Sequence, residues 1–175
     1  MSDELIACLI TGFITIFITI LGFIVTYNMN KKNYKEELNN NKKVQNIEKL
    51  QDVIVAVIDQ MNDITNVNIV EWKKIITNII SYGSTDAIKI ITYLQTNLYK
   101  YKDNPLPKNE NAVFMLTTFS LLITQIKYDL TGEILPPLTY LKIKITDFNK
   151  LENEYYIKNN EIVDELNLNI NFKTI

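Results

Sequence analysis

Six small or polar side chains recur on one side of a long uncharged run near the N-terminus. They are Cys8, Thr11, Thr15, Thr19, Gly22 and Thr26. At about 100° per residue they fall within an arc of about 80° on a helical projection. Threonine hydroxyls on such a stripe can bond across to another helix, bond back to their own backbone, or line a polar path. We expect this stripe to be a helix–helix interface.

The residue types needed for the common catalytic and metal sites are scarce in this chain. There is no histidine, and Cys8 is the single cysteine, which excludes a disulfide framework, a Cys/His zinc site and a nucleophilic triad. Only Gly83 and Gly132 lie outside the uncharged run, so no phosphate-binding loop is expected. Cys8 could be acylated or could cross-link a dimer, although a small residue on a packing face is the simpler interpretation. We predict no catalytic residue, cofactor or metal.

Two carboxylate pairs and the single tryptophan are the other candidates for a site. Asp59 and Asp63 share a helix face at i and i+4, and Asp129 and Glu133 flank the sequence DLTG. Paired carboxylates can do general acid–base work, but on a lysine-rich helical surface a solvated face is the favoured interpretation. Trp72 is in phase with neighbouring isoleucines, which favours core packing over a ligand pocket.

The uncharged run itself predicts a membrane span. Residues 5–27 are twenty-three positions without a charge, about 35 Å as a helix and long enough for a hydrocarbon core of about 30 Å. A cleaved signal peptide is disfavoured, because the start is acidic and no small-residue cleavage site follows. No lysine precedes the run, and five follow it closely: Lys31, Lys32, Lys35, Lys42 and Lys43. This asymmetry predicts that residues 1–4 lie outside the cell and that the chain after the span lies in the cytoplasm.

Beyond the span the pattern predicts an all-α protein. Residues 28–46 form a polar juxtamembrane stalk, which we expect to be mostly helical and weakest at the three asparagines 39–41. Residues 47–165 form one cytosolic bundle of four to five helices, with its centre in the apolar stretch 111–130. Residues 166–175 are expected to be a loose tail. Residues 140–145 alternate like a strand and could pair with 167–175, but a short helix is favoured because a lone strand leaves its backbone unsatisfied.

The predicted helices have recognisable ends. Asn68 is a candidate N-cap of a helix that ends near Tyr82. Gly83 is expected to end that helix in a left-handed conformation, with Ser84 capping the next helix. Gly132 is expected to end the central helix in the same way. These glycines and the serine are predicted to be structural turns.

Two blocks of the sequence resemble a group of bacterial proteins. SYGSTDAIKIITYLQ (81–95) and LLITQIKYDLTGEILPPLTYLKIKITDF (121–148) are similar to blocks of uncharacterised bacterial single-pass membrane proteins with a small all-helical cytosolic domain. The resemblance covers about a third of the chain. It implies one N-terminal span and a helical cytosolic body, and it implies no catalytic residue.

Charge and composition narrow the choice of partners. All eighteen basic residues are lysines, and all of them follow the span. Two of the twenty acids, Asp3 and Glu4, precede the span, so eighteen acids balance the eighteen lysines after it. A domain without net charge and without arginine is not expected to bind nucleic acid. We expect a lipid bilayer, self-association and a protein partner. A membrane-anchored interaction module is the leading hypothesis; a membrane-perturbing, pore-forming effector of a toxin or phage-defence system is the alternative, and a membrane-tethered enzyme comes last.

Overall fold

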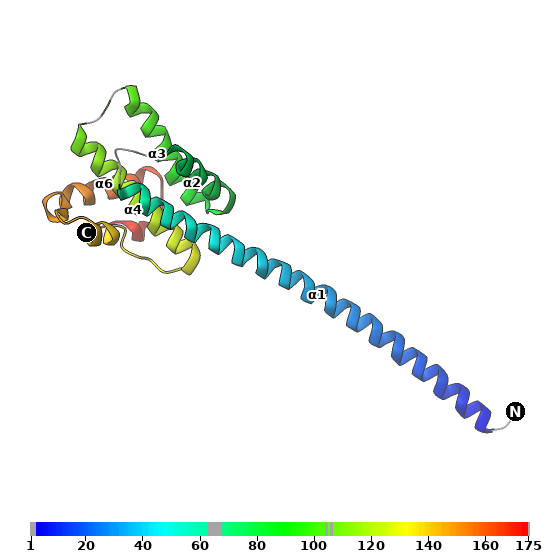
Figure 1. Ribbon diagram of the computed structural model, residues 1–175. Coiled ribbons are helices and arrows are strands. Elements are labelled where there is room, and N and C mark those ends of the chain that lie inside the picture. The colour runs from blue at the N-terminus through cyan, green and yellow to red at the C-terminus, as the bar shows by residue number, and fades with distance from the viewer. Residues whose placement is uncertain (1–2, 63–67, 104, 106, 175) are drawn as a thin grey trace. The chain divides into compact units, whose positions relative to one another are not determined.

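The described part of the chain is entirely helical. The computed structural model describes the backbone of residues 3–62, 68–103, 105 and 107–174, and the side chains of these residues apart from 3–18, 20, 21, 24, 42, 102, 103 and 108. Six α-helices and two short 3-10 helices follow one another (Figure 1), and these residues contain no strand. The all-α class is confirmed. The helices are α1 Asp3–Asn62, α2 Ile69–Tyr82, α3 Thr85–Asp103, α4 Lys108–Thr131, α5 Thr139–Lys144, η1 Phe148–Lys150, α6 Glu152–Glu165 and η2 Ile170–Phe172.

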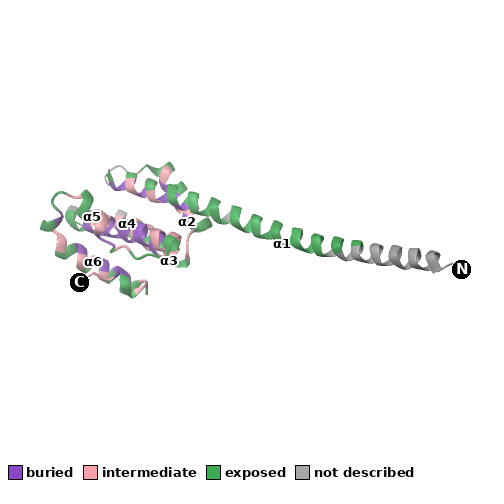
Figure 2. Ribbon diagram, turned by 90° about the horizontal axis from the view of Figure 1, so that it is seen from below, coloured by how far each residue is buried: buried purple, intermediate pink, exposed green. Residues whose placement is uncertain are grey.

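The chain divides into two compact units, Met1–Gln45 and Asn46–Ile175. The first unit is a single helix, the N-terminal part of α1. Helix α1 runs on without a break through the asparagines at 39–41, where the sequence predicted a weak point. Asparagine costs a helix less than about 1 kcal/mol per residue, and no proline interrupts the segment. Every side chain described from Thr19 to Lys49 is exposed (Figure 2).

The second unit is built around α4. This helix lies between α3 and α6 (Figure 1), and every residue from Val113 to Ile126 except Leu116 is buried. The predicted centre of the bundle is therefore where α4 lies. Two of the buried hydroxyls on α4 find backbone acceptors: Thr118 donates to the carbonyl of Phe114 at 2.7 Å, and Ser120 donates to the carbonyl of Pro137.

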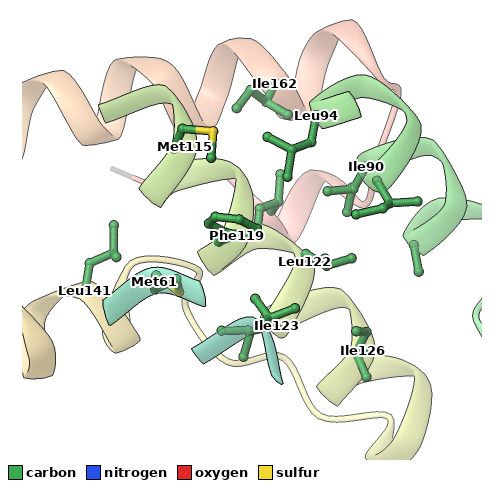
Figure 3. Packing of buried hydrophobic residues seen from close by; sticks show 14 of the residues in the cluster. Met61, Ile90, Leu94, Met115, Phe119, Leu122, Ile123, Ile126, Leu141 and Ile162 are labelled. Atoms are coloured by element: carbon green, nitrogen blue, oxygen red, sulfur yellow. The ribbon is translucent and has the colours of Figure 1, made fainter. Parts of the chain in front are cut away.

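The last turns of α1 complete the core of this unit (Figure 3). Leu50, Val53, Val57 and Met61 are buried and recur at spacings of three and four residues. That spacing places them on one face of the helix. Ile47, three residues before Leu50, is exposed, so the buried face begins at Leu50.

The turn after α2 and the turn after α4 have different backbone conformations. Ser84 caps α3 as predicted, because its Oγ accepts a hydrogen bond from the N–H of Ala87 at 3.2 Å. Gly132 ends α4 in the left-handed conformation, with φ 72°. The same prediction for Gly83 is wrong, because Gly83 is extended at φ −78° and ψ 162°. A Cβ at Gly83 would lie 2.7 Å from the carbonyl oxygen of Ile79, so close approach rather than left-handed geometry favours glycine there.

The C-terminal segment is packed, in contrast to the loose tail that was predicted. Phe172 of η2 is fully buried and meets the ring of Tyr128 edge-on at 5.8 Å. The buried amide of Asn159 on α6 donates to the carbonyl of Phe172 at 2.8 Å. The neighbouring Asn160 exchanges hydrogen bonds with the backbone of Thr174. Residues 140–145 are mostly helical, within α5, as favoured, and they have no strand partner in residues 167–174.

Candidate functional site

The predicted interface stripe is described only in its second half. Cys8, Thr11 and Thr15 lie among the residues whose side chains are not described. Thr19, Gly22 and Thr26 lie on α1 and are exposed. Apart from the backbone of α1, no described atom lies within 4 Å of where a Cβ on Gly22 would stand.

Large apolar side chains on the same part of α1 are exposed as well. Phe23 keeps 74% of its surface and Tyr27 67%, and Val25 and Met29 are also exposed. Single exposed apolar residues are ordinary, but a run of them on one helix indicates a surface that contacts something other than water. None of the other described side chains in residues 19–45 is buried against this surface.

The described residues do not test the predicted membrane span. Within the side chains that are described, no helix carries an apolar stretch long enough to cross a bilayer. Residues 5–18, which make up most of the expected span, lie outside that set.

The other candidates from the sequence are two carboxylate pairs and Trp72. Asp63 lies outside the described residues, so its pairing with Asp59 is not described. Asp129 accepts a hydrogen bond from Gln125 at 2.7 Å, whereas Glu133 lies 3.7 Å from Lys127, so the two carboxylates have separate partners. Trp72 is buried, donates to Gln95 at 2.7 Å and meets Phe119 edge-on, which agrees with a packing role. In the described part of the chain, no group of three or more acidic, cysteine or histidine side chains could hold a metal ion.

A cavity of about 290 Å³ lies between α3, α4 and α6. Three aromatic rings line it: Phe114 packs edge-on against Tyr101 with ring centres 5.5 Å apart, and tilted against Tyr93 at 5.9 Å. We call this cavity the tyrosine pocket. It is lined by Tyr93, Tyr101, Glu110, Val113, Phe114, Glu154, Ile157 and Lys158.

Carboxylates surround the tyrosine pocket. Glu110 lies in the first turn of α4 and Glu154 in the first turn of α6, where acidic side chains stabilise the positive end of the helix dipole. Tyr93 donates its hydroxyl hydrogen bond to Glu165 at 3.1 Å. Burial raises the pKa of Tyr93 well above its usual value, and the negative charges of Glu165 and Glu161 raise it further.

A second cavity, of about 440 Å³, lies beside α5, α6 and η2, and Lys142 and Lys173 line it. Both lysines are already paired. Lys142 lies 3.0 Å from Glu152 and donates to the hydroxyl of Tyr156 at 2.7 Å, and Lys173 lies 2.6 Å from Asp164. The hydrogen bonds to Tyr156 and Glu152 raise the pKa of Lys142, and those from Tyr156 and Lys142 lower the pKa of Glu152. The Lys142–Glu152 pair joins α5 to α6, and the Lys173–Asp164 pair joins the C-terminal segment to α6.

Comparison with protein family models, with curated proteins and with solved structures finds no match to this chain. Any function must therefore be argued from its own residues. The tyrosine pocket was not predicted from the sequence. The spacing of Tyr93 and Tyr101, about two helical turns apart, is a local signal, but it does not show that Phe114 lies beside them.

Proposed function

We propose that this chain is a single-pass membrane anchor with a cytoplasmic helical bundle that acts by binding a protein partner or a second copy of itself. Residues 5–27 cross the bilayer with the N-terminus outside, and residues 46–175 form the bundle on the lysine side. The threonine stripe meets another helix within the membrane. The chain has no catalytic role in this proposal.

One observation carries the proposal: the apolar side chains of α1 around Phe23 and Tyr27 are exposed in the described part of the chain. A lipid environment gives these side chains the apolar contacts that water does not. The uncharged sequence of residues 5–27 and the lysines after it support the same placement. The lack of histidine, with the single cysteine inside the run, supports a binding role over a catalytic one.

The anchor is tested by extracting membranes of expressing cells with alkaline carbonate. The wild-type protein is expected to stay in the pellet. Ile16→Arg, in the middle of the run, is expected to move into the supernatant, because arginine at the centre of a span costs about 2.5–3.5 kcal/mol on insertion scales. The matched control Asn30→Arg adds the same charge beyond the run and stays in the pellet. Release of the wild-type protein by carbonate would contradict the proposal.

A further inference from the structure

The tyrosine pocket has an apolar floor and a charged rim. Val113 and Phe114 are buried, Tyr93 and Tyr101 are half-buried, and Glu110 and Glu154 are exposed. The cavity volume of about 290 Å³ is close to the lower end of the range for small-ligand pockets. A small ligand or a single side chain is the size of occupant that fits.

The described charges around this pocket are mostly negative. Neither Glu110 nor Glu154 has an ion-pair partner among the described residues, and Glu161 and Glu165 lie close by on α6. Lys158, the one lysine in the described lining, is bound to Glu161 at 2.6 Å. Tyr101 lies in the last turn of α3, where the helix dipole presents its negative end. An anion would be repelled here, whereas a cation would be attracted.

Aromatic rings combined with carboxylates are the chemistry that holds organic cations. A ring face attracts an ammonium group through its quadrupole, and the surrounding methyl or methylene groups gain apolar contact. We propose that the tyrosine pocket binds an alkylammonium cation, held by the rings of Tyr93, Tyr101 and Phe114 and by the carboxylates of Glu110 and Glu154. Such a cation can be a free quaternary ammonium compound or the ammonium group of a lysine side chain. The inference does not depend on the membrane anchor.

The competing explanation is that each carboxylate only stabilises the N-terminus of its own helix. In that case the pocket has no preference for charge, and it would accept a neutral molecule of the same shape equally well. Choline and its neutral isostere 3,3-dimethylbutan-1-ol separate the two explanations, because they differ in one atom and one charge. n-Butylammonium represents a lysine side chain.

The experiment is a saturation-transfer NMR titration of these three compounds against the full-length protein in a maltoside detergent, which carries no ammonium group. At least one cation is expected to bind ten times or so more tightly than the neutral isostere, since ion pairing with carboxylates adds to the apolar contact. Tighter binding of choline identifies a quaternary ligand, and tighter binding of n-butylammonium identifies a lysine-like one.

Variants then assign the binding to this pocket. Glu110→Gln with Glu154→Gln is expected to weaken cation binding about tenfold and to leave the neutral isostere unchanged. Tyr101→Leu keeps apolar volume and is expected to weaken cation binding severalfold. Lys158→Gln, which removes a positive charge from the lining, is expected to strengthen cation binding. Equal binding of cation and isostere, cation binding that the glutamate variant does not change, or no saturable binding up to about 50 mM would overturn the proposal.

Discussion

Gly83 ends α2 and Gly132 ends α4 for different physical reasons, and substitutions at the two positions are expected to have different effects on stability. Gly83→Ala places a Cβ 2.7 Å from the backbone oxygen of Ile79, so the last turn of α2 has to shift. We expect a loss of about 1–3 kcal/mol in the free energy of unfolding, as for other overpacked sites. Urea denaturation followed by circular dichroism measures the loss.

Gly132→Asn is the matched control for this substitution. Gly132 has φ 72°, which asparagine tolerates, and no atom lies within 4 Å of where its Cβ would be. The control is expected to lose less than about 1 kcal/mol. If Gly83→Ala is as stable as Gly132→Asn, the close approach to Ile79 does not constrain the turn.

At the scale of the elements, a hydrogen bond between α3 and α6 makes the stability of the bundle sensitive to alkaline pH. Burial raises the pKa of Tyr93, and Glu165, the acceptor of its hydroxyl hydrogen bond, raises it further. An unfolded tyrosine loses its proton near pH 10, whereas the folded one holds it to higher pH. Above pH 10 the unfolded state therefore binds fewer protons, and stability falls as pH rises.

Above pH 10, Tyr93→Phe is therefore expected to reduce the slope of the free energy of unfolding against pH. The reduction corresponds to a difference of up to about one bound proton between the folded and unfolded states. At neutral pH it costs about 0.5–1.5 kcal/mol for the lost hydrogen bond. Glu165→Gln removes the negative charge and keeps the tyrosine, so its slope is expected to lie between the two. The measurement is urea denaturation at several pH values from 7 to 11. A slope for Tyr93→Phe equal to that of the wild type would show that Tyr93 does not titrate differently on unfolding.

How far the sequence predicted these elements depended on whether their signals were local. The cap at Asn68, the end of α2 and the central place of α4 could all be predicted, because capping and apolar periodicity are properties of one segment. The tyrosine pocket could not, because Phe114 meets Tyr93 and Tyr101 only once α3 packs on α4. The prediction of a loose C-terminal tail was wrong for the same reason, since the order of this segment depends on the amide of Asn159 on α6.

At the scale of the whole molecule, the open issue is what the threonine stripe meets. Thr19, Gly22 and Thr26 are exposed on α1, and hydroxyls on such a stripe can join two helices or border a water path. The proposed function assigns the stripe to contact between two helices. A pore would require the same hydroxyls to face water between several copies. The two roles predict different responses of the cell.

Changing Thr15 and Thr19 to leucine tests this choice, because leucine keeps the span apolar and removes two hydroxyls from one side. We expect cross-linked oligomers in membranes to fall at least severalfold, since the interhelical hydrogen bonds and the close approach are both lost. Membrane potential is expected to be unchanged when either protein is expressed. The matched control, Phe13→Leu with Phe17→Leu, has the same i, i+4 spacing on the opposite side of the helical projection and should leave the oligomers intact. Collapse of the potential by the wild type, abolished by the threonine variant, would instead assign the stripe to a conducting path.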